Sequence, residues 1–496
     1  IPYHQVIAYS LHVRGFTRHA SSKVKSKGTF QGIIEKIDYL TDLGINQIHC
    51  MPVYEFEECQ TYRNYWGYGE GFYFAPKSAY SSDGDGARGL KDMVKACHKA
   101  GIEVVLEMPF CTGADKMMML ECLRYYVMEY HIDGFRFDLM GIHDIETMNA
   151  IRRALDEIDP TICMYGEGWA ANAPQLPDSL LAKKKNASQL PHIGMFCDEM
   201  RDSLRGPWGN DVKGAFLIGR MGYAAGVKFG LAGGIAHPQL VSDKESAVPV
   251  FWAAQPEQLI SYVSCHDDLC LADRLKATLP GLSALEMNAL AKLAATAVFT
   301  SQGIPFWYAG DEILRNKQGV ANSYKSPDAI NAINWGRKTS QRDFFDYVRG
   351  LIAMRKAHPS FRMGNADLIA KHLEFLPVPA SNVVAFRIKG SPAGDSWLNT
   401  IVVLNARTEP VQIDVPEGRY WIACRDGRIE KRIYPAALSG THNLACKLRV
   451  CCFVPQKNAF AARYFFTQSA YDSKSCFYSC FGQSRHYIHK DYLEQF

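Results

Sequence analysis

The sequence has little of what marks proteins that bind nucleic acids or membranes. Its 496 residues carry a net charge of only +4, and they contain no long basic run. No apolar stretch reaches membrane-spanning length, and no signal-peptide pattern is present. We therefore expect neither nucleic acid nor a membrane as a partner. A hydrophobic content of 47% instead indicates a globular protein with a large core.

A cysteine framework is also missing. The 15 cysteines are odd in number and scattered, and several lie inside apolar segments, including Cys50, Cys163 and Cys265. This spacing disfavours disulfide pairing and a zinc site, and it favours buried thiols in a reducing compartment. We expect a cytoplasmic protein, with secretion as the alternative if Ile1 is a processed end.

No glycine-rich phosphate loop follows the first strand-like segment, although an open sheet that binds a nucleotide usually has one there. Up to about residue 357, apolar runs instead alternate with amphipathic segments, as in a parallel sheet covered by helices. One such segment, 28–44, repeats apolar residues at helical spacing and ends at Gly44. The pattern predicts an α/β protein with a (β/α)8 TIM barrel. Its eight expected strands are 6–14, 45–53, 102–110, 132–140, 161–169, 192–199, 259–267 and 304–312.

Composition divides the chain into three parts. Residues 1–360 form the expected barrel, which the helical segment 342–362 closes. Residues 361–430 contain short alternating segments and turn signals, which predict a small antiparallel β-sandwich domain. Residues 431–496 hold five cysteines and clustered aromatic residues without a clear period, and we assign this tail no function.

Charged side chains recur at the ends of the expected strands. Arg136 and Asp138 are two residues apart, so on a strand they face the same side. Taken alone, this pair is most simply a structural ion pair. Glu167 and Asp267 follow later strands, at the end where barrel enzymes assemble their active sites. Three further charged residues lie at or just beyond the ends of expected strands: Arg14, Glu55 and Asp311.

Three carboxylates at the open end of one barrel can supply the two groups that retaining glycoside hydrolysis needs. These groups are a nucleophile and a general acid, which lie about 5–5.5 Å apart. Asp138 fits the nucleophile, because Arg136 favours its ionised form. Glu167 fits the acid/base, because apolar neighbours such as Trp169 raise the pKa of a carboxyl group. Asp267 fits a third role, which is to hold sugar hydroxyls and favour ring distortion.

Flat apolar side chains that can stack on sugar rings crowd one loop. The loop contains Tyr62, Tyr65, Trp66, Tyr68, Phe72 and Tyr73. On composition alone Trp66 favours structural packing, whereas packing and sugar binding are equally compatible with Tyr68. His266 is adjacent to Asp267 at a strand end, which favours a functional role over that of a core histidine.

Together these motifs resemble the α-amylase superfamily of glycoside hydrolases, family 13, and within it the type I pullulanases. The segments that carry the resemblance are DGFRFDLMGIH (133–143), YGEGW (165–169), YWGY (65–68), YFAPK (73–77), GIPFWYAGDE (303–312) and NSYKSPDAINAINW (322–335). The resemblance covers about residues 6–430.

The resemblance implies a role for each candidate residue. Asp138 would be the nucleophile, Glu167 the acid/base and Asp267 the transition-state stabiliser. The substrate would be bound by Arg136, His266, Tyr68, Trp66 and Trp169. The bond implied is the α-1,6-glucosidic linkage of pullulan and of branched starch or glycogen fragments.

The third expected strand departs from the family pattern. Glu107 replaces the usual aspartate, Cys111 and Thr112 occupy the places of Asn and His, and the loop that follows is shortened. Losing one donor to a bound hydroxyl costs about 1–3 kcal/mol, so we expect weakened activity or altered specificity. The tail after residue 430 does not match the closing strands of the family.

We expect a pullulanase-like debranching enzyme whose partner is an α-glucan polysaccharide or oligosaccharide. The alternatives are a catalytically weak or inactive carbohydrate-binding homologue and an isoamylase-type glycogen debranching enzyme. We expect a monomer that requires no cofactor, and we assign no metal ligands. A structural calcium ion stays open, because dispersed oxygen ligands leave little pattern in a sequence.

Overall fold

The computed structural model describes residues 1–58, 63–110, 114–171, 176–242, 248–416, 420–425, 428–435, 443–446 and 450–455. The predicted TIM barrel is confirmed: eight parallel strands close in the order β1-β10-β9-β8-β7-β6-β5-β2. Each strand lies within one of the eight apolar runs. The strands are β1 (Ala8–Leu11), β2 (Gln47–Cys50), β5 (Glu103–Met108), β6 (Gly134–Phe137), β7 (Cys163–Gly166), β8 (Gly194–Phe196), β9 (Leu259–Ser261) and β10 (Ile304–Tyr308).

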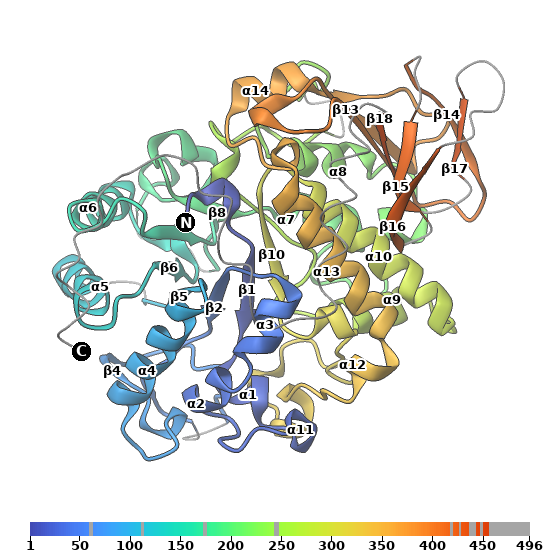
Figure 1. Cartoon of the computed structure of the whole chain (residues 1–496). Helices are drawn as coiled ribbons and strands as arrows, with labels where there is room; N and C mark the ends of the chain where they lie inside the picture. Colours follow the sequence, from blue (N-terminus) through green and yellow to red (C-terminus); the bar gives the residue numbers. More distant parts are fainter. Residues whose placement is uncertain are drawn as a thin grey trace, which may run out of the picture.

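Helices surround the barrel, and a short hairpin of β3 (Tyr54–Phe56) and β4 (Gly71–Pro76) follows β2 (Figure 1). The barrel helices are α1 (Val13–Thr17), α2 (Phe30–Ile34), α3 (Ile37–Leu43), α4 (Gly86–Lys99), α5 (Lys116–Tyr130), α6 (Ile145–Asp156), α7 (Asp198–Arg205), α8 (Ala224–Leu231), α9 (Leu271–Thr278), α10 (Ala284–Thr300), α11 (Asp328–Asn331), α12 (Arg337–Ser340) and α13 (Arg342–Ala357). Seven of these helices begin after a residue whose side chain accepts a hydrogen bond from the first helical turn: α1, α2, α4, α5, α6, α7 and α10. In α10, for example, Ser283 and Glu286 form a reciprocal capping box.

The segment 28–44 ends at Gly44 as predicted, but it forms two helices, α2 and α3, rather than one. The break falls at Glu35 and Lys36. The Glu35 carboxylate accepts hydrogen bonds from the backbone N–H groups of Lys25 and Ser26, at 2.8 and 2.9 Å. This anchor ties the turn to the preceding loop, and it rests on a contact that helical periodicity does not reveal.

Side chains of successive strand residues point alternately into the barrel and toward the helices. On β6, Phe135 and Phe137 pack in the large core between strands and helices. Arg136, between them, points inward, where its guanidinium lies 5.4 Å from the Phe196 ring. A separate inner core includes Val105, Tyr165, Phe196, Ile260 and Phe306. The strand period therefore places an arginine inside the barrel, directly below its open end.

After the barrel, α14 (Ala366–His372) leads into an antiparallel β-domain beside α8, α10 and α13 (Figure 1). One sheet has the order β11-β12-β13-β18-β15-β16, and β14 pairs with β17 in a second layer. Val411 and Ile413 of β14 pack on Val383 and Ile401 of the first sheet. The strands are β11 (Leu373–Phe375), β12 (Val383–Lys389), β13 (Asn399–Asn405), β14 (Val411–Asp414), β15 (Tyr420–Arg425), β16 (Arg428–Pro435), β17 (Asn443–Cys446) and β18 (Val450–Pro455).

The boundary expected at residue 430 is wrong. The sheet continues beyond it through β16, β17 and β18, and β18 lies between β13 and β15. The part of the tail up to Pro455 therefore supplies closing strands, contrary to the expectation for 431–496. Cysteine-rich composition hid these strands, because Cys451 and Cys452 do not signal a strand as strongly as β-branched residues do. Residues 456–496 lie outside the described part of the chain.

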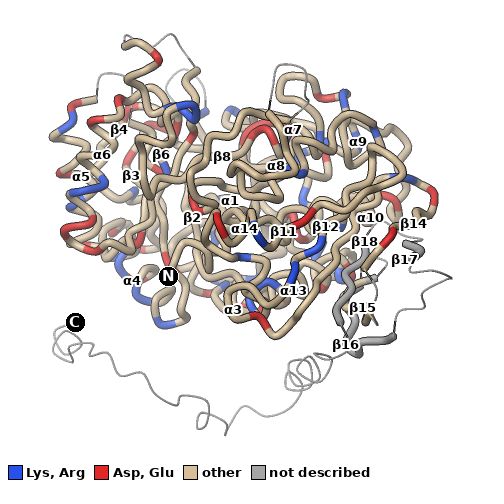
Figure 2. The backbone as a smooth tube through the Cα atoms, turned by 90° about the horizontal axis from the view of Figure 1, so that it is seen from above, with Lys and Arg blue, Asp and Glu red and all other residues tan. Residues whose placement is uncertain are grey.

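Basic and acidic residues are interspersed along the described backbone (Figure 2). The eight cysteines whose state the structure describes are all free, and seven are buried, as their scattered spacing predicts. Among helices in the described residues, none is long and apolar enough to cross a membrane.

Candidate active site

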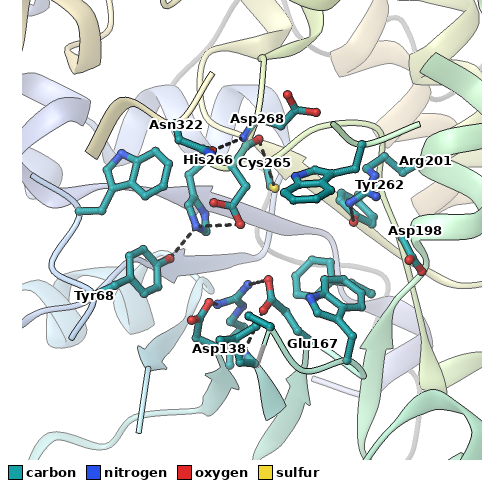
Figure 3. Close-up of a pocket in the computed structure, with 18 of the residues that line it drawn as sticks. Tyr68, Asp138, Glu167, Asp198, Arg201, Tyr262, Cys265, His266, Asp268 and Asn322 are labelled. Atoms are coloured by element: carbon teal, nitrogen blue, oxygen red, sulfur yellow. Dashed lines mark hydrogen bonds and ion pairs between the residues drawn. The ribbon is translucent and has the colours of Figure 1, made fainter. Parts of the chain in front are cut away.

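A cavity of about 900 Å³ opens at the carboxyl end of the barrel strands (Figure 3). Asp138, Glu167 and Asp267 all line it, and they follow β6, β7 and β9. All eight residues to which the family resemblance gives a role lie in its wall, the other five being Arg136, His266, Tyr68, Trp66 and Trp169. The barrel thus brings together side chains that are up to about 200 positions apart, as the strand-end principle predicts.

One guanidinium connects the two expected catalytic carboxylates. Arg136 is 3% exposed, and its Nη1 donates to Asp138 Oδ1 at 2.6 Å. Its Nη2 donates to Glu167 Oε1 at 2.8 Å, and Glu107 accepts a further bond from Nη1. Burial works against the charged form of Arg136, but the three carboxylates raise its pKa above the usual value. Arg136 is therefore a permanent positive charge that fixes Asp138 and Glu167 relative to each other.

The two carboxyl groups have separated pKa values. Burial raises the pKa of Asp138 to about 6; Arg136 lowers it, whereas Glu107 and Asp267 add to the rise. Burial also raises the pKa of Glu167 to about 8, against Arg136 and with the charges of Asp138 and Asp267. Arg136 acts on Asp138 in the predicted direction, although burial outweighs it. At neutral pH the pair is suited to hold one proton, on Glu167.

The backbone after Asp138 packs closely against the loop that follows β7. Leu139 has a φ of 44°, an uncommon conformation for a side chain of this size, and its N–H donates to Glu167 Oε2 at 2.8 Å. The N–H of Gly141 contacts the carbonyls of Glu167 and Trp169 at 3.0 and 3.1 Å. A Cβ on Gly141 would lie 2.5 Å from the Trp169 carbonyl oxygen. Glycine therefore allows the β6 and β7 loops to pack closely.

Glu107 joins the opposite wall of the cavity to Arg136. It is fully buried at the end of β5, where Oε2 lies 2.9 Å from His49 Nε2 and Oε1 accepts a 2.6 Å bond from the Tyr68 hydroxyl. The Tyr68 hydroxyl also lies 2.8 Å from His266 Nε2, and the two rings stack with centroids 5.1 Å apart. The glutamate therefore links the third barrel strand to the Tyr68 and His266 side of the cavity. Cys111 and Thr112 lie outside the described residues.

Trp66 is 5% exposed and packs edge-on to His266, with centroids 4.9 Å apart. Its indole is thus mainly a support for His266, although it reaches the cavity wall. Trp169 is half-buried in that wall, with Lys184 Nζ 5.4 Å from its ring. Asp267 is more accessible: its side chain is 41% exposed, and Oδ2 lies 3.6 Å from His266 Nε2.

The loop that carries His266 and Asp267 is anchored by a buried lysine. Lys317 Nζ donates to the carbonyls of His266 at 2.8 Å, of Asp268 at 2.6 Å and of Ala321 at 2.5 Å. Asn322 Oδ1 accepts from the Asp268 N–H at 2.9 Å. Sequence reasoning missed Lys317, because a single lysine gives no signal of burial. Asn322 belongs to a segment that was recognised, but its contact was not.

Several predicted candidates lie outside the cavity wall that the described residues form. Arg14 makes a two-point ion pair with Asp328, at 2.9 and 2.8 Å, and Glu55 pairs with Lys77 at 2.9 Å. Asp311 is buried and accepts a hydrogen bond from Ser264. Tyr65, Phe72 and Tyr73 do not reach the wall either, and Tyr62 lies outside the described residues.

No cluster of three or more His, Cys, Asp or Glu side chains is arranged to hold a metal ion in the described part of the chain. A structural calcium ion stays a prediction, because calcium also takes backbone carbonyl and amide oxygen ligands.

Family models match two parts of the chain. A model of the pullulanase all-beta domain matches residues 369–428, and one of the alpha amylase catalytic domain matches residues 16–116. The curated pullulanase of Bacillus subtilis (strain 168) is 30% identical over 469 residues, which cover 83% of this chain and 64% of that protein. Isoamylase SU1 of Zea mays is 27% identical over 530 residues, covering 84% of this chain and 64% of its own length. The chain therefore spans somewhat less than two thirds of these relatives.

Solved structures agree with the sequence matches. The pullulanase of Paenibacillus barengoltzii, solved with maltohexaose and α-cyclodextrin, superposes with a TM-score of 0.84 at 33% identity, covering 92% of this chain and 78% of that one. A type I pullulanase from Bacillus subtilis, solved with maltose, has a TM-score of 0.84 at 27% identity and covers 91% and 70%. The barrel, the β-domain and these matches show that the chain belongs to the type I pullulanase family of the α-amylase superfamily, glycoside hydrolase family 13.

Proposed function

We propose that this chain hydrolyses α-1,6-glucosidic bonds in pullulan and in branched fragments of starch or glycogen, with retention of configuration. The observation that carries the proposal is that the Arg136 guanidinium is hydrogen-bonded to both Asp138 and Glu167. The pKa of Asp138 is about 6, and the pKa of Glu167 is about 8. Its family relatives support the substrate class, since one pullulanase was solved with maltohexaose and α-cyclodextrin.

In the first step, an ionised Asp138 oxygen attacks the anomeric carbon of the sugar. The bond from that carbon to O6 of the leaving glucan breaks, and Glu167 donates its proton to O6. The product is a glycosyl ester on Asp138 and a released glucan with a free 6-hydroxyl. Arg136 supports this step because it favours the ionised form of Asp138, while burial keeps the proton on Glu167.

In the second step, the same groups exchange roles. The Glu167 carboxylate removes a proton from water, and the water oxygen attacks the anomeric carbon as the bond to Asp138 breaks. Two inversions restore the α configuration, and Glu167 is again protonated. Asp267, accessible in the cavity and close to His266, is placed to accept hydrogen bonds from sugar hydroxyls. The ring of Tyr68 supplies an apolar surface in the same wall.

Digestion of pullulan with product analysis tests the proposal. We expect release of maltotriose, with the α-anomer formed first when the products are followed by ¹H NMR. Asp138→Asn should abolish release while it preserves binding. Binding without release by the unmodified chain, unchanged in Asp138→Asn, would instead establish a carbohydrate-binding homologue. Rapid attack on glycogen with slow attack on pullulan would indicate an isoamylase-type debranching enzyme.

We further propose that the chain acts as a monomer without a required cofactor, and that it works in the cytoplasm. The free cysteines of the described residues support a reducing compartment. Activity that survives EDTA, a monomeric mass in light scattering and recovery from the cytoplasmic fraction are the results expected. Loss of activity in EDTA that calcium restores would contradict the cofactor proposal.

A further inference from the structure

An exposed tryptophan lies in the wall of the active-site cavity. Trp208 is 64% exposed and lines the cavity. Each other tryptophan whose side chain the structure describes is half-buried or buried. Tryptophan carries a large apolar surface that folding normally removes from water, so an open indole at the edge of a binding cavity indicates a contact made with a ligand.

The loop that presents Trp208 is held in place by its backbone. Arg274 is fully buried, and its Nη2 donates to the carbonyls of Pro207 at 2.9 Å, Asn210 at 2.8 Å and Lys213 at 3.2 Å. At the start of the loop, Gly206 has a φ of 107°, and a Cβ there would lie 1.8 Å from the Lys213 carbonyl oxygen. None of these contacts uses the indole. The loop backbone that carries the tryptophan is therefore held in place before a ligand binds. This lowers the conformational entropy that is lost when the ligand binds.

The surroundings of Trp208 are suited to sugars. Asp198, Asp202 and Arg205 line the same cavity, and they come from the α7 segment just before the loop. Sugar sites combine an apolar face for the ring with charged groups for the hydroxyls. In Figure 3, Asp198 lies across the cavity from Tyr68, and Glu167 lies between these two sides.

We propose that Trp208 stacks on a glucose ring of the glucan that leaves in the first step. This inference rests on the proposed function. Tyr68 is in the wall next to His266, on the side expected to hold the sugar that Asp138 attacks. Glu167 protonates the leaving oxygen from between the two sides. The glucan beyond that oxygen then extends along the α7 wall, where Trp208 provides an apolar platform.

Two substrates that differ in their leaving group test this assignment. Cleavage of pullulan releases a glucan as the leaving group. Cleavage of α-maltotriosyl fluoride releases fluoride, so this substrate needs no sugar on the α7 side. The ratio of kcat/KM for pullulan to that for the fluoride should fall about three- to tenfold in Trp208→Ala, the range expected for one aromatic stacking contact. Trp208→Phe, which keeps a flat ring, should recover part of the loss.

Val212→Ala is the matched control. Val212 is in the same loop and is 69% exposed, but it is not among the residues that line the cavity. Its ratio should equal that of the unmodified chain. A ratio for Trp208→Ala equal to that for Val212→Ala would overturn the assignment, and so would an equal loss on both substrates.

Binding provides a readout that does not need hydrolysis. In an Asp138→Asn background, electrophoresis through a gel containing pullulan should retard the protein, and Trp208→Ala should weaken this retardation where Val212→Ala does not. If retardation depends on Trp208 but the unmodified chain releases no maltotriose, the Trp208 contact with the glucan is supported and the proposed function is overturned. Retardation unaffected by Trp208→Ala would overturn the contact itself.

Discussion

Glu107 is the buried charge whose removal has the most definite expected consequence. Its carboxylate contacts Arg136, His49 and Tyr68, and no part of its side chain is exposed. Burial alone would raise its pKa, but Arg136 and then His49 outweigh burial and lower the pKa to about 2. We expect Glu107→Gln to keep the size of the side chain and remove this charge.

The magnitude follows from the pKa. The ordinary value for glutamate is 4.5, and the folded value is about 2. At about 1.4 kcal/mol for each pKa unit, the ionised Glu107 contributes about 3 kcal/mol to the free energy of unfolding at neutral pH. A lowered pKa means that this stability is present above the unfolded value and is lost as the pH falls through the folded one. At pH 3.5 about 2 kcal/mol should remain.

Urea unfolding followed by tryptophan fluorescence measures the effect. Glu107→Gln should be less stable than the unmodified chain by about 3 kcal/mol at pH 7 and by about 2 kcal/mol at pH 3.5. Glu121→Gln, which changes an exposed carboxylate on α5, should shift stability by less than about 0.5 kcal/mol. A loss under about 1 kcal/mol at pH 7, or a difference that grows as the pH falls, would refute the reasoning.

Three further results are expected. The kcat/KM for pullulan should follow a bell-shaped pH profile with limbs near 6 and 8, because Asp138 must be ionised and Glu167 protonated; a single limb would contradict this. Lys317→Met should lower kcat and thermal stability, because each carbonyl left unbonded costs about 1–3 kcal/mol; unchanged kcat would show that the Asp267 loop needs no anchor. Gly141→Ala should reduce kcat and the unfolding temperature, since its Cβ would meet the Trp169 carbonyl; wild-type values would contradict the packing argument.

The barrel could be predicted from the sequence because each strand is buried on both faces. Such strands appear as short apolar runs, and a charged residue inside one, such as Arg136, stands out against them. The break between α2 and α3 and the strands after residue 430 could not be predicted. Glu35 binds backbone groups nine and ten residues earlier, and β18 pairs between strands far from it in sequence.

The site residues also divide into those that could be predicted from the sequence and those that could not. Asp138, Glu167 and Asp267 could be found because parallel strands bring their carboxyl ends to one face. Glu55 is also a strand-end acid, yet it pairs with Lys77 away from the cavity. Lys317 and Trp208 reach the site from later segments. Their positions in the cavity wall depend on the tertiary fold, so no local spacing could have singled them out.

Identification of the nucleophile tests the central claim most directly. A 5-fluoro-α-maltotriosyl fluoride slows both steps by its ring fluorine, while its reactive leaving group allows the glycosyl ester to form and accumulate. Mass spectrometry of a peptic digest should then find the sugar on Asp138, in the peptide that contains Arg136. A sugar on Glu167 or Asp267 would contradict the assignment, and so would the absence of any covalent product together with β-anomeric products from pullulan.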